Sequence, residues 1–373
     1  MALSIDVLSS YPPVQEAEVD KVLAEEIRDN EKKIVVLDDD PTGVQTVHDI
    51  SVYTNWEKAS IEQGFAEENK LFYILTNSRG FTAAQTEKAH KEIAEVVDQV
   101  AKETGKEYLF ISRSDSTLRG HYPLETTILK DEYEKNTGKK IDGEVLCPFF
   151  KEGGRFTIDD VHYVQYDDTL VPAAETEFAK DKTFGYTVSN LKEYVEEKTQ
   201  GAYKKENVTA ISLENIRELN YDKIEEQLLA VEDFNKVIVN AIDYVDVKIF
   251  CVALFRAMKK GKNVMFRTAA AIVKVMGGVS NQPLLTREQM VVKETDNGGI
   301  IVVGSHTDKT TRQMEKLREN KDIAFVELNA TLVNNEAAFA EEVERCLALE
   351  EEYISSGKSV CVYTTRVLIT ADT

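Results

Sequence analysis

The segment from residue 34 to residue 43 constrains the fold of this chain more than any other. Four apolar residues are followed there by three consecutive aspartates, Asp38, Asp39 and Asp40, and then by a Pro-Thr-Gly turn. A short apolar run that is rich in β-branched residues and closed by proline and glycine predicts a buried β-strand. In open α/β sheets the ligand crevice lies at the carboxyl ends of such strands. We therefore expect a functional site here, in which a cation, a metal ion or a proton balances at least one carboxylate.

The same pattern of an apolar run with a polar end returns twice more. Residues 71–75 and 108–111 are apolar, and each run leads into a segment that carries serine and arginine. Between them, Thr82 and Gln85 resemble a capping box that begins a helix, and Gly105 ends it. The order strand, helix, strand predicts parallel neighbours with a right-handed crossover. The polar ends of all three strands should therefore meet at one edge of the sheet.

A group of arginines follows these predicted strands directly. Its members are Arg79, Arg113, Arg119 and, after a further strand, Arg155. The planar guanidinium suits bidentate recognition of carboxylates and phosphates, which predicts a site for a small anionic ligand. The hydroxyls of Ser78, Ser116 and Thr117 would suit a polyhydroxylated ligand, although serine and threonine also cap helices.

The overall charge of the chain limits its partners. The formal net charge is −21, so the field of the molecule repels nucleic acid and anionic membranes. We therefore expect neither as a partner, and an anionic substrate needs a local basic cluster. The four cysteines and five histidines show no metal-ligand spacing, and no secretory signal or membrane-spanning stretch is present. These features predict reduced cysteines in a cytoplasmic protein, and they leave a homo-oligomer open.

The length of 373 residues predicts two domains. Strand and helix patterns alternate to about residue 270, and the polar stretch at residues 168–201 predicts a helical insertion. Glycine and proline then mark a connection before a new strand at residue 300. We predict an α/β protein whose two domains are each a mainly parallel sheet flanked by helices, the second of them incomplete. The expected parts are a leader at 1–33, a first domain at 34–272, a linker at 273–298 and a partial second domain at 299–373.

The second predicted domain begins with a strand, a turn of small residues and a helix. The turn and the helix start contain Gly304, Ser305, Thr307 and Thr310. Such an arrangement directs free backbone N–H groups towards an anion at the positive end of the helix dipole. Ordinary helix capping is the alternative explanation of these residues.

Several of these segments together resemble the four-carbon acid sugar kinase family. They are residues 38–43, 76–79, 113–120, 147–148 with 154–155, and 303–305 with Thr310 and Gln313. The resemblance covers about residues 34–364, and the Asp-Ser-Thr-Leu-Arg-Gly segment at 115–120 is its most specific part. It implies ATP-dependent phosphorylation of the terminal hydroxyl of threonate, erythronate or a 3-oxo-tetronate. It also implies a sugar-acid-binding first domain and a nucleotide-binding second domain.

The resemblance implies roles for individual residues. Asp38, Asp39 and Asp115 would be catalytic, with Asp38 or Asp39 as the base or as a Mg²⁺ contact, and Asp39 is the predicted metal ligand. The substrate would be bound by Ser78, Arg79, Arg113, Ser116, Arg119, Gly120 and Arg155. ATP would be bound by Gly304, Ser305, Thr307 and Thr310.

Two features depart from the family pattern. Arg113 stands where the family usually has lysine, and arginine does not release its proton, so its role there must be electrostatic. The glycine-rich ATP loop expected after the strand near Tyr363 is absent, and the apolar tail at 367–373 has no covering helix. These features predict a chain truncated at its C-terminus.

Two other functions are compatible with parts of the sequence. Residues 35–42 also fit the Asp-x-Asp-x-Thr signature of haloacid dehalogenase-like phosphatases, in which Asp38 would attack a phosphate and Asp40 would act as acid and base. That hypothesis leaves residues 115–120 unexplained. A truncated sugar-acid-binding module without turnover is the other alternative.

Overall fold

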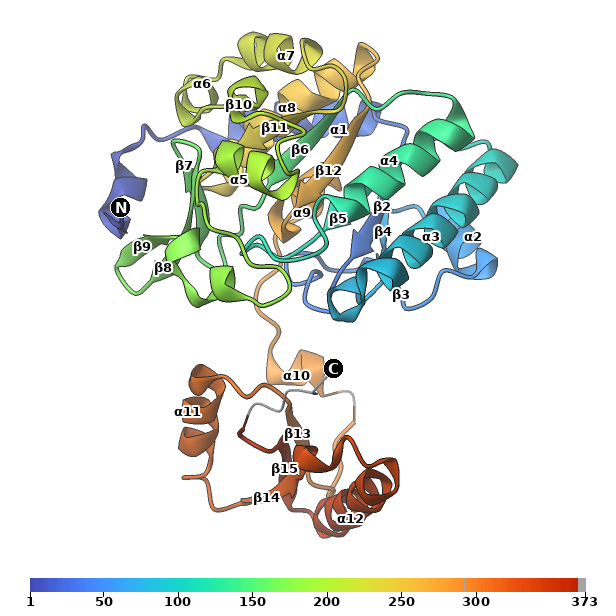
Figure 1. Ribbon diagram of the computed structural model, residues 1–373, viewed down its shortest axis with the longest axis vertical. Coiled ribbons are helices and arrows are strands. Elements are labelled where there is room, and N and C mark those ends of the chain that lie inside the picture. Colours follow the sequence, from blue (N-terminus) through green and yellow to red (C-terminus); the bar gives the residue numbers. More distant parts are fainter. Residues whose placement is uncertain (292, 368–373) are drawn as a thin grey trace. The chain divides into compact units, whose positions relative to one another are not determined.

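The computed structural model describes residues 1–291 and 293–367. The chain divides into two compact units, Met1–Gln282 and Pro283–Thr373, and each is described by itself. The first contains a large parallel sheet flanked by helices, and the second contains a smaller parallel sheet (Figure 1). The predicted α/β class is therefore confirmed.

The main sheet of the first unit has eight strands in the order β10-β11-β6-β12-β5-β2-β4-β3, all paired in parallel. In chain order they are β2 (Lys33–Asp38), β3 (Val52–Tyr53), β4 (Leu71–Leu75), β5 (Tyr108–Arg113), β6 (Gly143–Cys147), β10 (Thr209–Ile211), β11 (Asn235–Val239) and β12 (Val264–Thr268). The strand that ends in the aspartates, β2, lies between β4 and β5. The predicted parallel arrangement of these three strands is thus confirmed.

Both faces of the main sheet are buried, which explains why its strands are continuous apolar runs. Side chains alternate between the faces along a strand: Ile34 and Val36 of β2 belong to one core, and Val35 and Leu37 belong to the other. The first core is covered by α1 (Glu16–Asp29), α6 (Leu213–Arg217), α7 (Tyr221–Leu229), α8 (Tyr244–Lys259) and α9 (Ala270–Met276). The second is covered by α2 (Lys58–Ala66), α3 (Ala83–Thr104) and α4 (Leu124–Thr137).

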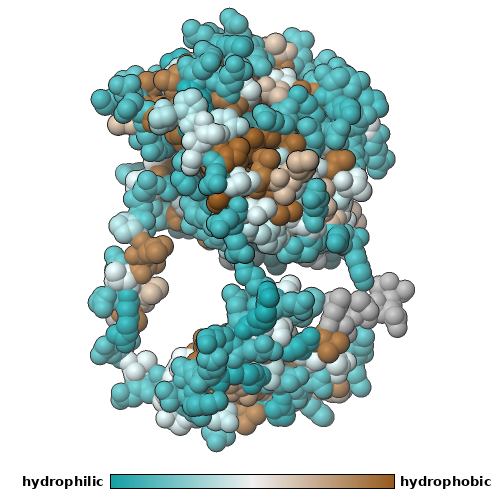
Figure 2. All heavy atoms as spheres, turned by 90° about the vertical axis from the view of Figure 1, so that its left-hand side faces the viewer, coloured by the Kyte–Doolittle hydropathy of each residue, from teal (hydrophilic) through white to brown (hydrophobic). Residues whose placement is uncertain are grey.

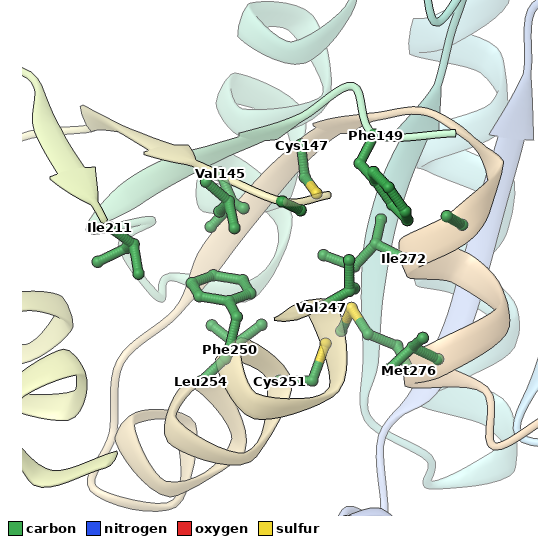
Figure 3. Packing of buried hydrophobic residues seen from close by; sticks show 14 of the residues in the cluster. Val145, Cys147, Phe149, Ile211, Val247, Phe250, Cys251, Leu254, Ile272 and Met276 are labelled. Atoms are coloured by element: carbon green, nitrogen blue, oxygen red, sulfur yellow. The ribbon is translucent and has the colours of Figure 1, made fainter. Parts of the chain in front are cut away.

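The first core is densely apolar where α8 and α9 pack on the sheet. Figure 3 shows Phe250 and Cys251 of α8 in one apolar cluster with Met276 of α9 and with Val145 and Cys147 of strand β6. All four cysteines of the chain are buried, and none forms a disulfide. They pack as small apolar side chains in the two units.

Helix α3 begins and ends as its sequence predicts. The Thr82 hydroxyl accepts the N–H of Gln85, and the Gln85 side chain accepts the N–H of Thr82, which is the predicted capping box. Gly105 ends the helix in the left-handed conformation, with φ of 66°. The helix thereby joins β4 to β5 on the second face of the sheet.

The predicted helical insertion at residues 168–201 is largely wrong. Residues 169–172 instead form a strand of an antiparallel sheet with the order β1-β9-β8-β7. Its strands are β1 (Leu3–Ser4), β7 (Arg155–Ile158), β8 (Val161–Tyr166) and β9 (Thr169–Pro172), and the only α-helix of the stretch is α5 (Leu191–Lys198). The β-branched and aromatic residues of β8 and β9 favour a strand. The helix formers that follow β9 make only 3-10 turns.

The N-terminal stretch and the predicted linker both contribute to the first unit. Strand β1 pairs with β9, and helix α1 lies on α8, where Lys248 forms ion pairs with Glu16 and Asp20. Helix α9 continues to Met276, four residues into the stretch predicted as linker from residue 273. The boundaries proposed from the sequence otherwise stay predictions.

The second unit is a three-stranded parallel sheet in the order β13-β15-β14. Its elements are α10 (Arg287–Met290), β13 (Ile300–Val303), α11 (Asp308–Leu317), β14 (Ile323–Leu328), α12 (Glu336–Ser355) and β15 (Ser359–Thr364), which match the predicted order of strands and helices after residue 299. Helix α12 packs on the sheet through Cys346, against Val326 and Val360.

Residues 368–373 of the predicted apolar tail lie outside the described residues. Among the helices that the structure describes, none is long and apolar enough to cross a bilayer.

Candidate active site

The aspartate segment lies at the carboxyl edge of the main sheet, between two arginines. Asp38 ends β2 and is the register partner of Arg113, which ends β5. Arg79 lies in the 3-10 turn Ser78–Gly80 that follows β4, and its N–H donates to the Asp39 carbonyl at 3.1 Å. Parallel neighbouring strands therefore place all of these side chains at one edge, as expected for an open α/β sheet.

Two arginines neutralise most of the charge of the aspartates. Arg79 donates two hydrogen bonds to Asp39, from Nη2 to Oδ1 at 2.6 Å and from Nε to Oδ2 at 3.1 Å. Arg79 also forms an ion pair with Asp40. Arg113 forms an ion pair with Asp38, and its Nη2 lies 2.9 Å from Asp40 Oδ1. Three carboxylates thus share two guanidinium groups in a mostly buried cluster.

The three aspartates have different proton affinities because their burial and partners differ. Burial raises the pKa of Asp38 to about 7, although the charge of Arg113 opposes the rise. Burial also raises the pKa of Asp39. Burial would also raise the pKa of Asp40, but Arg79, Thr42 and Arg113 stabilise its charged form more strongly. The pKa of Asp40 is therefore lowered. Only Asp40 is therefore held firmly ionised.

A second acidic group lies in the loop after β5. Arg119 Nε lies 2.7 Å from Asp115 Oδ2, and the Thr117 hydroxyl also donates to that carboxylate. Burial alone would raise the pKa of Asp115, but the arginines and Thr117 lower it to about 2. Gly120, with φ of 122°, brings this loop back to the aspartate cluster, because a Cβ atom there would lie 3.3 Å from Asp39 Oδ2.

The loop from Ser116 to Arg119 is held by its backbone. Each of its four carbonyls accepts a hydrogen bond from a different side chain: Ser116 from His162 at 2.7 Å, Thr117 from Tyr186 at 2.8 Å, Leu118 from Tyr194 at 2.8 Å and Arg119 from Arg267 at 2.7 Å. All four donors are buried. Such bonds fix the loop although Leu118 has a left-handed φ of 69°. The loop therefore presents Asp115 and Arg119 from a preorganised backbone.

We expect the histidine that supports this loop to make stability depend on pH. Burial lowers the pKa of His162 to about 4, so protonation favours the unfolded state once the pH falls below the ordinary histidine pKa of about 6.5. The first unit should lose about 2 kcal/mol of stability from this group between pH 7.5 and pH 5. Urea unfolding of wild type and His162→Gln at both values measures it, with His48→Gln as control. An equal pH dependence in wild type and His162→Gln would contradict the prediction.

Most predicted substrate residues lie in this one cluster, but their side chains are not equally available. Three of the arginines are partly exposed, namely Arg79, Arg119 and Arg155. Arg113 is only 5% exposed, and its guanidinium group forms ion pairs with aspartates of the cluster. The Ser78 hydroxyl points away to Glu125, at 2.8 Å. Arg155 lies beside Arg119, since both guanidinium groups lie over the ring of Phe178, at 5.6 and 5.1 Å from its centre.

The sequence interpretation missed three buried residues that support the site. Arg267 is the penultimate residue of the apolar strand β12, a position close to the pattern that singled out Arg113, so it could have been found. Glu125, which accepts from Ser78, and His162 follow no strand directly. Their roles depend on tertiary packing, and no local pattern marks them.

We predict that Gly43→Ala disrupts the ion pair beneath the aspartate turn. A Cβ atom at Gly43 would lie 2.1 Å from Arg113 Nε and 2.2 Å from Asp38 Oδ2, so this buried pair must shift. Such overpacking should cost about 1–3 kcal/mol, measured by urea unfolding. Gly80→Ala is the control, because nothing lies within 4 Å of its Cβ position. Equal stabilities of the two variants would be evidence against the described geometry.

The predicted nucleotide residues gather at the start of α11 in the second unit. The Thr307 hydroxyl accepts the N–H of Thr310 and lies 3.3 Å from the Ser305 hydroxyl, which accepts from the Thr310 hydroxyl at 3.1 Å. Arg366, which the sequence interpretation missed, lies beside them: its Nη2 donates to the Ser305 carbonyl at 2.5 Å. Hydroxyls, a helix N-terminus and a guanidinium are groups that bind phosphate.

Two family profiles match the chain, one in each unit. Residues 34–276 match a family described as a sugar-binding N-terminal domain, and residues 300–373 match one described as a nucleotide-binding C-terminal domain. The predicted C-terminal truncation is not borne out by these matches. No curated protein matches the chain in sequence.

Solved structures with a similar arrangement come from three bacteria. A Bordetella bronchiseptica domain of unknown function, a domain-swapped dimer with bound citrate, has 17% identity, a TM-score of 0.48, and coverage of 91% of this chain and 75% of its own. A Haemophilus influenzae protein has 17% identity, a TM-score of 0.49, and coverage of 88% and 74%. A Salmonella typhimurium LT2 protein, provisionally described as a tRNA synthase, has 14% identity, a TM-score of 0.54, and coverage of 90% and 75%. The last likeness supports the fold.

Proposed function

Because the chain belongs to the four-carbon acid sugar kinase family, we propose that it transfers the γ-phosphoryl group of ATP to the terminal hydroxyl of a four-carbon sugar acid. The substrate would be threonate, erythronate or a 3-oxo-tetronate. The observation that carries this proposal is the convergence of arginines and aspartates from separate strands on one sheet edge, in a domain of the sugar-binding family. A small anionic polyol needs this mixture of guanidinium groups and hydrogen-bond acceptors.

The exposed fractions of the acidic side chains indicate which carboxylates a substrate can reach. The exposed side-chain fractions of Asp40 and Asp115 are 18% and 12%, against 1% for Asp38 and 3% for Asp39. We infer that Asp115 accepts the hydrogen bond of the attacking hydroxyl, because Arg119 and Thr117 keep it ionised beside the arginines. The hydroxyl oxygen then bonds to the γ-phosphorus as the bond to ADP breaks, and its proton passes to the carboxylate. Such a reaction depends mainly on positioning and charge neutralisation.

The aspartate cluster fits Mg²⁺ in donor type and spacing. Asp38, Asp39 and Asp40 each offer a carboxylate oxygen, and these oxygens lie within 4.8 Å of one another. Magnesium prefers oxygen ligands and usually takes one or two carboxylates together with substrate phosphates. When bound, Mg²⁺ would neutralise phosphate charge. Asp39 remains our proposed ligand together with the more exposed Asp40, and Arg79 and Arg113 orient both carboxylates.

The second unit would bind ATP through its phosphates. Its nucleotide-binding family and the hydroxyl cluster of Ser305, Thr307 and Thr310 support this role. Gly304 leaves open space beside that cluster, since nothing lies within 4 Å of its Cβ position. Arg366 adds a positive charge to the same group.

Incubation of the full chain with ATP, Mg²⁺ and a panel of tetronates tests the proposal. Release of ADP that depends on the sugar acid is the expected result. Release of phosphate from sugar phosphates would instead indicate the phosphatase, and ligand-induced thermal stabilisation without turnover would indicate a binding module. The burial of Asp38 and its ion pair with Arg113 disfavour the phosphatase, because a nucleophile must reach the phosphate.

A further inference from the structure

Arg155 differs from the other arginines of the site in its partners. Arg79, Arg113 and Arg119 each form an ion pair with at least one aspartate. Arg155 forms none with the residues that the structure describes, and its Nε is buried without a hydrogen-bond acceptor. A buried guanidinium N–H without an acceptor is costly. An anionic acceptor at Arg155 would remove this cost.

Arg267 also has no acidic partner among the described residues, but its guanidinium group supports the backbone of the loop at Arg119. It is 3% exposed, and its Nη2 donates to the Arg119 carbonyl at 2.7 Å. Arg155, in contrast, is partly exposed. A ligand from solution can therefore reach Arg155 more readily than Arg267.

Two guanidinium groups of the site lie on one aromatic ring. Arg119 and Arg155 both lie over Phe178, at 5.1 and 5.6 Å from the ring centre. Burial lowers the pKa of Arg155; the charge of Asp115 opposes this change, and the charge of Arg119 adds to it. Asp115 is bonded directly to Arg119, so Arg155 has no ion-pair partner of its own among the described residues. An anion that contacts both guanidinium groups would supply an acceptor to Arg155.

The charges of the site are consequently divided between two ends. One end holds three carboxylates and two guanidinium groups, namely Asp38, Asp39 and Asp40 with Arg79 and Arg113. The other end has Arg119 and Arg155, with Arg267 behind the loop. Asp115 lies between the two ends, since it is bonded to Arg119 and is also influenced by the charge of Arg79. A sugar acid has a carboxylate at one end and a hydroxyl at the other, so this division favours one of its two orientations.

We propose that Arg155 and Arg119, supported by Phe178, form the subsite that binds the substrate carboxylate. This assignment rests on the proposed function and fixes the orientation of its substrate. The carboxylate faces Arg155, and the hydroxyl that accepts the phosphoryl group faces Asp115 and the aspartate cluster. Arg79 and Arg113, already occupied by aspartates, then orient carboxylates of the protein and do not bind the carboxylate of the substrate.

The test compares a sugar acid with the tetritol of the same configuration, which lacks the carboxylate. Arg155→Gln should lower kcat/KM for the acid by about 30- to 100-fold, chiefly through KM, because a hydrogen bond to a charged group is lost. Its kcat/KM for the tetritol and its KM for ATP should equal those of wild type. Arg155→Lys, which keeps the charge without the planar fork, should retain part of the activity on the acid. Arg28→Gln is the matched control, because the Arg28 side chain is 74% exposed on α1.

Two results would overturn the assignment. In one, Arg155→Gln loses activity equally on acid and tetritol, which would indicate a structural role. In the other, its KM for the acid is unchanged, which would place the carboxylate elsewhere. Thermal stabilisation by acid and tetritol without ATP keeps the subsite testable if no turnover occurs. Stabilisation of wild type, but not of Arg155→Gln, by the acid would then support the subsite while the kinase proposal fails.

Discussion

Asp115→Asn is expected to lower kcat for the sugar acid by about 10²- to 10⁴-fold, the range for loss of a positioned proton acceptor. Asparagine keeps the shape of the side chain but removes the negative charge that orients the attacking hydroxyl. The loop itself should persist, because its carbonyls are held by His162, Tyr186, Tyr194 and Arg267. Steady-state kinetics with saturating ATP measures the effect.

The control for this variant is another aspartate of the same unit. Asp131 lies in α4 with 61% of its side chain exposed, so Asp131→Asn should leave kcat at the wild-type value. The KM for ATP should change in neither variant. Retention of more than a tenth of wild-type kcat by Asp115→Asn would exclude Asp115 as the acceptor and leave Asp38 or Asp39 in that role.

The largest effect on stability is expected from a buried ion pair between β6 and β11. Lys236 Nζ lies 2.7 Å from Glu144 Oε2, and both side chains are completely buried. Lys236 also lies over the rings of Phe234 and Tyr203, at 3.4 and 4.1 Å from their centres. Lys236→Met leaves Glu144 as an uncompensated buried charge and should destabilise the first unit by about 3–5 kcal/mol. Urea unfolding measures this change.

A double variant separates the missing charge from altered packing. Lys236→Met with Glu144→Leu removes both charges, and replacing a buried pair with apolar residues is often neutral, so most of the lost stability should return. Lys204→Met, which breaks an exposed ion pair with Glu196, should change stability by about 0–1 kcal/mol. If Lys236→Met were no more destabilising than Lys204→Met, the buried pair would not support this part of the sheet.

The parallel sheets were predictable because their signals are local. Apolar runs such as residues 71–75 end in turn residues, and Thr82, Gln85 and Gly105 give helix α3 its caps. The antiparallel sheet was missed although β7, β8 and β9 are joined by two-residue turns, whose aspartates at 159, 160 and 167 have the positive φ typical of hairpin loops. Only the pairing of β9 with β1 depends on a distant segment. Local helix propensity in residues 168–201 was overridden by this tertiary pairing.

The sequence predicted which residues lie at the strand ends. It did not predict which of these arginines pair with aspartates and which remain free of them. Topology alone brings Asp38, Arg79 and Arg113 together, since β2 lies between β4 and β5. Which arginines are occupied by aspartates depends on side-chain geometry, and so does the contact of Arg155 with Phe178 from a later segment. Those features appear only when the whole first unit is folded.

³¹P NMR of this chain with ATP, Mg²⁺ and a four-carbon sugar acid identifies the group that is phosphorylated. We expect a new phosphomonoester signal, coupled to two methylene protons, that grows with ADP and requires both the sugar acid and Asp115. Inorganic phosphate as the sole product, or a phosphate on an internal hydroxyl, would contradict it.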